Sequence, residues 1–131
     1  MRRPATYGTA IILAHLLINI AHGLAHGELG IGLTPLGSAF VIVVIMVLPL
    51  IAMALLWTVR KRLGLILLTL SMFGALLFGL YHHFAIAGPD HVHAQPSGGW
   101  GSMFVLTSYL LLISEALGTY VGFFFLKRGE R

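Results

Sequence analysis

Four apolar stretches divide the chain, and short polar segments separate them. They cover about residues 7–24, 36–59, 63–84 and 103–126. A helix needs roughly 20 residues to cross a hydrocarbon core about 30 Å thick, and each stretch reaches about that length. Because a chain inside a bilayer must satisfy its backbone hydrogen bonds internally, the stretches predict four transmembrane helices. We expect residues 1–131 to form a single membrane domain, an all-α antiparallel up-down four-helix bundle.

Positive charge lies on one side of this arrangement. All eight Lys and Arg residues fall before the first stretch, between the second and third, or after the fourth. They are Arg2, Arg3, Arg60, Lys61, Arg62, Lys127, Arg128 and Arg131. Because cytoplasmic loops of membrane proteins carry an excess of Lys and Arg, we expect both termini to be cytoplasmic. The other two connections contain no Lys or Arg, so the His-rich loops are predicted to be extracytoplasmic.

Composition narrows the classes of function. The chain is 58% hydrophobic and only 9% charged, which is typical of an integral membrane protein. It has no cysteine, which excludes disulfides, thiolate ligands and thiol catalysis and leaves histidine, carboxylate, methionine or backbone oxygen to bind a metal. The net charge of +4 comes from clusters that flank apolar segments. That pattern is topological, and we expect no nucleic-acid partner.

A polar stripe interrupts the first apolar stretch. His15, Asn19, His22 and His26 follow one another at 4, 7 and 11 residues from the first. At about 100° per residue these steps place all four on one narrow arc of a helix. Imidazole and amide groups are costly in hydrocarbon unless they are hydrogen-bonded. The stripe therefore predicts a polar site that faces other helices or a water-filled cavity.

The histidines favour a transition-metal site at the extracytoplasmic face. His22 and His26 are four residues apart, the spacing at which one helix presents two imidazoles to one ion. His91 and His93 form an H-x-H pair whose side chains point to the same side of an extended segment. The predicted ligands are His22, His26, His82, His83, His91 and His93, with Asn19, Glu28 and Asp90 as accessory candidates. Ligation by nitrogen without thiolate suits copper, zinc or iron, in metal handling or a redox role.

A carboxyl group lies near the middle of the fourth stretch. Such a group is expensive in a membrane helix and marks a functional site by default, which singles out Glu115. At about 1.5 Å per residue, His15 lies roughly 12 Å and Glu115 roughly 17 Å from the cytoplasmic ends of their helices. Helix tilt can remove this difference. We therefore predict that His15 and Glu115 approach each other as an interior polar pair.

Two further features predict how the helices pack. Pro49 lies near the middle of the second stretch, where the missing N–H predicts a kink. Gly118 and Gly122 form a small-xxx-small pair that permits close approach of a neighbouring helix. That neighbour is either another helix of this bundle or a helix of a partner.

One alternative interpretation is haem b held by two histidines. One axial ligand would come from His15 or His22 of the first helix and the other from His82 or His83 of the third. Small residues on these helices leave room for a macrocycle. The absence of Lys and Arg from the extracytoplasmic side counts against it, since haem propionates need a basic partner.

A second alternative needs no cofactor. The protein is then a structural or accessory subunit of a membrane complex, or a proton-relay element in which Glu115, His15, Asn19, His22 and His26 conduct protons. A homo-oligomer is also consistent with so short a chain. The pattern assigns no catalytic residue and leaves open whether the protein is an enzyme.

Overall fold

Helices account for all regular structure in the computed structural model, which describes residues 3–129. Four segments are long and apolar enough to cross a membrane: Arg3–Glu28, Pro35–Leu56, Lys61–Ala85 and Gly99–Gly129. Arg2 and Arg131, which belong to the predicted basic clusters, lie outside the described residues. For residues 3–129, the prediction of an all-helical chain with four candidate membrane spans is confirmed.

Two of the spans are single helices and two change helix type along their length. The single helices are α1 (Arg3–Glu28) and α5 (Gly99–Gly129). The second span consists of α2 (Pro35–Phe40), the π-helical η1 (Val41–Val47) and α3 (Leu48–Leu56). The third consists of α4 (Lys61–Gly79) and the π-helical η2 (Leu80–Ala85), and the loop after it contains the 3-10 turn η3 (Val92–Ala94). The first and last helices extend beyond their apolar stretches because helical hydrogen bonding continues into polar flanks.

The π-helical segment η1 ends just before Pro49. The backbone N–H of Leu48 bonds to the carbonyl of Val43, five residues back, rather than four. In a regular α-helix the Pro49 ring would crowd the carbonyl four residues before it, and no N–H would reach that carbonyl. A wider turn at this point relieves the crowding, as π-helical insertions commonly do where a helix is interrupted.

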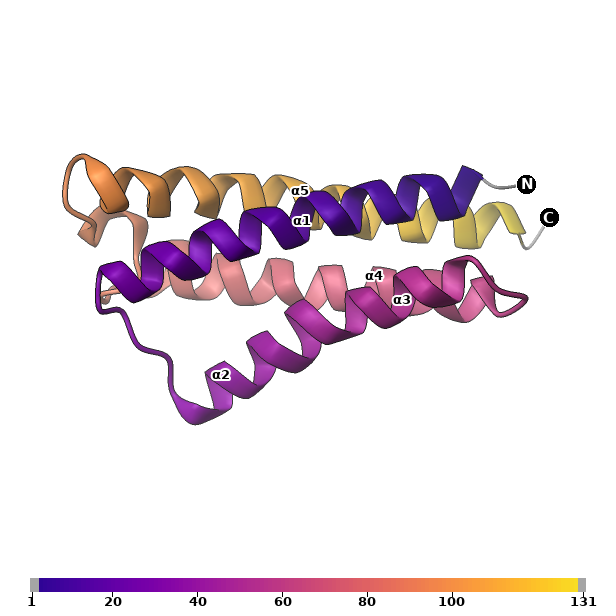
Figure 1. Cartoon of the computed structure of the whole chain (residues 1–131), viewed down its shortest axis with the longest axis horizontal. Coiled ribbons are helices and arrows are strands. Elements are labelled where there is room, and N and C mark those ends of the chain that lie inside the picture. Colours follow the sequence, from indigo (N-terminus) through magenta and orange to yellow (C-terminus); the bar gives the residue numbers. More distant parts are fainter. Residues whose placement is uncertain (1–2, 130–131) are drawn as a thin grey trace.

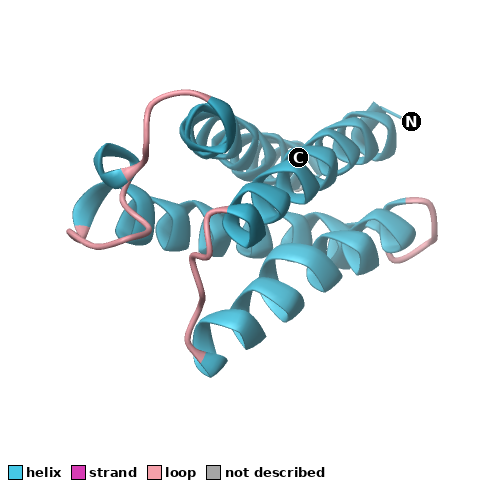
Figure 2. Ribbon diagram, turned by 60° about the vertical axis from the view of Figure 1, so that its left-hand side comes forward, coloured by secondary structure: helices cyan, strands magenta, loops and turns pink. Residues whose placement is uncertain are grey.

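The two ends of the bundle are built differently. We call the end that carries both termini and the α3–α4 turn the basic end, since Arg3, Arg60 and Lys127 lie there. The opposite end, with the loops at residues 29–34 and 86–98, is the histidine end. α5 packs along both α1 and α4, and α3 packs on α4. Figure 1 and Figure 2 show that α2, by contrast, diverges from α1 at the histidine end.

Glycines let the helix backbones touch near the basic end. A Cβ added to Gly64 of α4 would lie 2.9 Å from the backbone nitrogen of Leu56 in α3. A Cβ added to Gly122 of α5 would lie 3.1 Å from the backbone nitrogen of Thr69 in α4. The Gly118 and Gly122 pair therefore serves packing within this chain, with α4 as the neighbouring helix.

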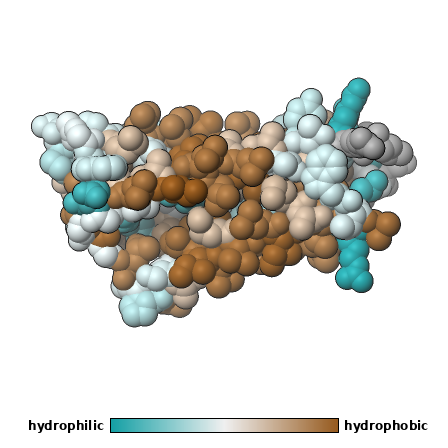
Figure 3. All heavy atoms as spheres, viewed as in Figure 1, coloured by the Kyte–Doolittle hydropathy of each residue, from teal (hydrophilic) through white to brown (hydrophobic). Residues whose placement is uncertain are grey.

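Apolar side chains cover the outside of the bundle between its two ends. Figure 3 shows this brown band, with paler and teal atoms gathered at either end. Large side chains point outward along it, including Leu17 at 68% exposure and Ile113 at 57%. A surface of this kind is stable in contact with lipid rather than water, so the band agrees with four helices that cross a membrane.

Candidate metal centre

Three histidines meet at the histidine end of the bundle. His22 and His26 come from the last two turns of α1, and His83 comes from η2. One ligand atom from each lies within 4.8 Å of the others. The ring centroid of His22 is 4.8 Å from that of His26 and 4.9 Å from that of His83. Three imidazoles at this separation can bind one metal ion.

Helix type and packing hold these three side chains in place. The helical turn at His83 is π-helical, and the N–H of Ile86 bonds to the carbonyl of Tyr81, five residues back. Such π-helical turns occur frequently at functional sites. The buried ring of Phe104 from α5 packs against all three imidazoles, with centroid distances of 4.6 to 5.3 Å. The cluster is thus closed on one side by an aromatic wall.

Hydrogen bonds to the Nδ1 atoms define which nitrogens are left to bind a metal. Nδ1 of His22 lies 2.8 Å from the hydroxyl oxygen of Thr107, and Nδ1 of His26 lies 3.1 Å from the carbonyl oxygen of Ile31. The Thr107 hydroxyl donates its own proton to a carbonyl of its helix, so it accepts from His22. In the neutral ring of His22, the proton therefore sits on Nδ1 and the lone pair on Nε2, and Nδ1 of His26 likewise carries a proton that it donates to Ile31.

The same assignment holds for His83. Its Nδ1 faces two oxygens of Asp90, the backbone carbonyl at 3.0 Å and the carboxylate Oδ1 at 3.2 Å, and both are acceptors. His22 and His83 thus turn a lone-pair nitrogen away from their hydrogen-bonding partners, whereas Nε2 of His26 faces Oδ1 of Asp90 at 3.2 Å. Nε2 of His22 is buried and has no hydrogen-bond partner. A buried lone pair without a donor is costly, and a cation held by the three imidazoles would satisfy it.

Asp90 brings a negative charge to the cluster. Its Oδ1 lies 3.2 Å from Nε2 of His26, and its Oδ2 lies 4.0 Å from Nδ1 of His82. Burial acts to raise the pKa of the Asp90 carboxyl, but the adjacent imidazole of His83, with smaller contributions from His26 and His22, outweighs burial and holds the pKa below its usual value. The carboxyl is therefore ionised, as a metal ligand or a counter-charge must be.

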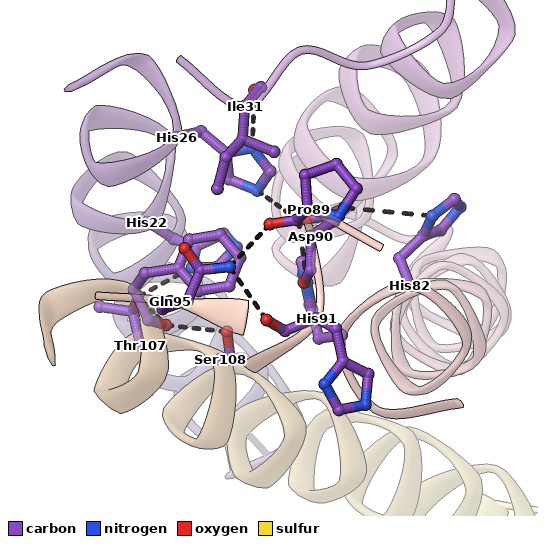
Figure 4. A network of polar contacts seen from close by, with 12 residues as sticks. His22, His26, Ile31, His82, Pro89, Asp90, His91, Gln95, Thr107 and Ser108 are labelled. Atoms are coloured by element: carbon purple, nitrogen blue, oxygen red, sulfur yellow. Dashed lines mark hydrogen bonds and ion pairs between the residues drawn. The ribbon is translucent and has the colours of Figure 1, made fainter. Parts of the chain in front are cut away.

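The loop at residues 86–98 is fastened over the site, which explains the position of Asp90. The Gln95 side chain donates to the carbonyls of Pro89, at 2.7 Å, and His91, at 2.9 Å. Nε2 of His91 lies 3.1 Å from the carbonyl of Phe84 at the end of η2, and Val92 is buried. Figure 4 shows Pro89 and Asp90 lying beside His26 and His22, with His82 on the far side.

Unlike Asp90, the other predicted histidine ligands and Glu28 do not join the three-histidine group within the described range. His82 packs its ring on Phe78 at 4.3 Å between centroids. Both ring nitrogens of His91 are engaged, with Phe84 and with the backbone N–H of His93. His93 and Glu28 are exposed. Of the six predicted ligands, the structure brings together His22, His26 and His83.

A second polar group lies deeper in the bundle, between α1 and α5. Nε2 of His15 lies 3.3 Å from Oε1 of Glu115, and the two residues are 1% and 2% exposed. The Asn19 amide donates to the carbonyl of His15 at 3.1 Å and meets its Nε2 at 2.9 Å. His15 Nε2 is thus an acceptor, which fits a Glu115 carboxyl that donates through Oε1. The remaining oxygen, Oε2, is buried and has no partner.

A cavity of about 490 Å³ connects the two polar groups. Its histidine end is lined by His22, His26, His83 and Asp90, and its deeper part by Asn19, Ser108 and Glu115. Ile42, Ile45 and Met46 of the second span, with Leu111 and Leu112 of α5, form much of its apolar wall. The volume lies within the range of small-molecule sites in proteins.

Sequence reasoning did not identify Thr107 as part of the site. Threonine in a helix usually bonds back to a carbonyl of the preceding turn, and Thr107 does so with Met103 at 2.7 Å. Its contact with His22 is therefore hidden behind a common local pattern. The placement of Thr107 two turns before Glu115, on a helix otherwise rich in Leu, is the only sequence signal for it.

Comparisons with known proteins do not add a family to this description. No protein-family model matches the chain, and neither a curated protein nor a solved structure matches it.

Proposed function

We propose that this chain is a membrane metalloprotein that holds one transition-metal ion at His22, His26 and His83. The observation that carries the proposal is the set of three clustered imidazoles, each fixed through Nδ1 by a hydrogen bond, together with the unpartnered Nε2 of His22. Outer hydrogen bonds of this kind orient metal-binding histidines and fix their tautomers. The ionised Asp90 supplies a fourth ligand or a counter-charge.

The donor set narrows the choice of metal. Three imidazole nitrogens and one carboxylate, without thiolate, suit zinc, copper or non-haem iron. Haem b fits less well, because axial histidines lie on opposite faces of a macrocycle. Here His22 and His83 contact each other edge to face, with centroids 4.9 Å apart, and His26 packs against both.

With three histidine ligands and Asp90 as a counter-charge, the ion would keep an open position and be reactive rather than purely structural. Structural sites are closed by four protein ligands, whereas catalytic sites keep a position for water or substrate. All three histidines line the 490 Å³ cavity, so an ion at this site would face it. Such an ion supplies Lewis-acid or redox chemistry to a molecule in the cavity.

The placement in the membrane follows from charge. Arg3, Arg60, Lys61 and Lys127 all lie at the basic end. Under the positive-inside rule, the bundle is antiparallel with both termini in the cytoplasm and the histidine end outside. The metal site then lies near the extracytoplasmic surface, below the loop at residues 86–98.

A proton-relay role is the second candidate, and it rests on the buried pair His15 and Glu115. Asn19 links the pair to the polar stripe of α1, and the cavity continues toward His22. Paired ionisable groups inside a membrane bundle are typical of proton pathways. The two roles are compatible, because protons often accompany reactions at a metal.

X-ray absorption spectroscopy on the detergent-purified protein loaded with one equivalent of Zn²⁺ tests the proposal. We expect scattering from three imidazoles at about 2.0–2.1 Å, with an additional oxygen. A variant that combines His91→Ala with His93→Ala should give the same spectrum, because these residues lie outside the three-histidine group. A spectrum dominated by oxygen ligands, without imidazole scattering, contradicts the proposal.

A further inference from the structure

Among the described residues, the cavity beneath the metal centre is lined by three residues with a buried acceptor that has no hydrogen-bond partner, two of them at one end and one at the other. Nε2 of His22 and Oδ1 of Asp90 lie at the histidine end, and Oε2 of Glu115 lies at the deeper end. Glu115 is 2% exposed and His22 is 6% exposed. Both side chains line the cavity, so a ligand that fills it can reach both. The cavity therefore has a polar lining at each end and an apolar lining between them.

The spacing of the two ends limits the ligand. Along α1, seven residues separate His22 from His15, the partner of Glu115, which corresponds to about 10 Å of helix. A single six-membered ring with an oxygen at each end, plus one hydrogen bond or metal bond at each oxygen, covers such a distance. The walls between the ends are aliphatic, with Ile45, Met46 and Leu111 among them. A flat apolar ring suits these walls.

The entry to the cavity indicates how such a molecule arrives. α1 and α5 are in contact, as are α4 and α5, but α2 diverges from α1 (Figure 2). Residues on both sides of this divergence, Gly23 of α1 and Ile42 of η1, line the cavity and are exposed. The opening therefore lies among lipid-facing side chains. A ligand that enters there dissolves in the bilayer and can leave an apolar tail in it.

We propose that the cavity binds the headgroup of a lipid-soluble para-quinol, with its alkyl or isoprenoid tail in the bilayer. One hydroxyl donates to Oε2 of Glu115, and the other oxygen meets the metal held at His22, His26 and His83. The contact between the quinol oxygen and the metal rests on the proposed function. The hydrogen bond to Glu115 requires no metal, because the protein itself supplies the acceptor.

A pair of glycines on α1 offers a matched test. A Cβ added to Gly23 or to Gly27 meets no atom within 4 Å, so both positions accept a larger side chain. Gly23 lines the cavity, whereas Gly27, one turn further along the same helix, does not. Gly23→Leu thus fills the cavity, and Gly27→Leu is the control with the same change of helix propensity. Glu115→Leu removes both carboxyl oxygens, whereas Glu115→Gln keeps a donor for His15 and an acceptor oxygen for the ligand.

The experiment is an anaerobic calorimetric titration of the Zn²⁺-loaded protein in detergent with decylubiquinol. We expect saturable binding of one equivalent, unchanged by Gly27→Leu. Glu115→Leu should weaken binding at least about tenfold, the loss that one hydrogen bond to a buried group predicts, and Glu115→Gln should retain it. Gly23→Leu should weaken binding at least about tenfold because its side chain occupies the cavity. The dimethyl ether of the same quinol keeps the ring and tail but has no donor. It should bind at least about tenfold more weakly.

The opposite results overturn the inference. Absence of saturable binding, or equal affinity of the wild type and Gly23→Leu for the quinol, would contradict it. Equal affinity for the quinol and its dimethyl ether would also contradict it and would indicate a site for an acyl chain. Metal analysis of the same samples separates this inference from the proposed function. Bound metal without quinol binding defeats only the inference, and quinol binding without metal defeats only the metal centre.

Discussion

The helices pack closely at the basic end of the bundle and leave a cavity at the histidine end. At the basic end a Cβ on Gly64 or Gly122 would meet a neighbouring backbone, and the core cluster consists of apolar residues such as Ile12, Leu68 and Met72. At the histidine end α2 diverges from α1, polar side chains are buried, and a cavity remains. Close backbone contact provides stability in one half of the molecule, which allows the other half to keep an open, polar site.

The buried polar atoms without a hydrogen-bond partner follow the same division. Among the described residues they are Nε2 of His22, Oδ1 of Asp90 and Oε2 of Glu115, and all three residues line the cavity. Unsatisfied polar groups reduce stability and persist where they serve function. The histidine end is therefore where ligands are expected, and variants at the two ends should separate stability from binding.

The largest effect is expected from loss of one ligand at the histidine end. His83→Ala should weaken Zn²⁺ binding well beyond the about 100-fold that outer hydrogen-bonding partners of a metal contribute, because it removes a ligand itself. His82→Ala is the matched control, since the neighbouring His82 lies outside the group and should bind Zn²⁺ as the wild type does. Competition with a chelator of known affinity measures both. Equal losses in the two variants would show that the group is wrongly defined.

Next in size is a packing defect at the basic end. Gly122→Leu forces a side chain against Thr69 and should lower the free energy of unfolding by about 2 kcal/mol. Gly23→Leu at the histidine end should change it by no more than about 0.5 kcal/mol, because its added Cβ meets open space. Unfolding in mixed micelles, followed by circular dichroism, gives both values. Similar destabilisation by both variants would contradict the division into a packed and an open end.

A smaller effect is expected from the hydroxyl that orients His22. Thr107→Val removes the acceptor of the His22 Nδ1 proton and should weaken Zn²⁺ binding about tenfold. Thr119→Val is the control on the same helix, because within residues 3–129 the Thr119 hydroxyl bonds to the backbone carbonyl of Glu115 and to no histidine. The same chelator competition distinguishes them. Unaltered affinity in Thr107→Val would show that this hydrogen bond does not orient the ring.

The smallest effect concerns the coupling of His15 with Glu115. The double variant His15→Ala with Glu115→Ala should be less destabilised than the sum of the single variants, with a coupling free energy of about 1 kcal/mol. Thermal unfolding of the four proteins in one detergent measures the cycle. Strict additivity would show that the contact contributes nothing beyond proximity.

Much of the fold and of the candidate site could be predicted from the pattern of apolar and polar residues in the sequence. Apolar length predicted the four spans, the i and i+4 spacing predicted that His22 and His26 share one site, and depth along the helices predicted that His15 meets Glu115. Length, spacing and depth are each measured along a single helix, and the sequence determines them directly.

Other features of the fold and the site depend on contacts between segments, which the residue pattern of a single segment does not predict. The second span is aliphatic on every side, so its pattern could not show that α2 diverges from α1. Asp90 reaches the cluster because Gln95 and His91 fasten their loop through carbonyl oxygens, which are the same in every residue. His83 could be recognised as a candidate ligand by type, whereas its selection over His82 depends on the packing of η2.

The most direct test of the metal centre is elemental analysis of the purified protein. The protein, purified in detergent and exchanged into metal-free buffer, should contain about one equivalent of zinc, copper or iron by mass spectrometry, or take up one equivalent on reconstitution. A variant that combines His22→Ala, His26→Ala and His83→Ala should contain none. Failure of the wild-type protein to bind any of the three metals, or equal metal content in the triple variant, would contradict the proposal that these histidines form a metal centre.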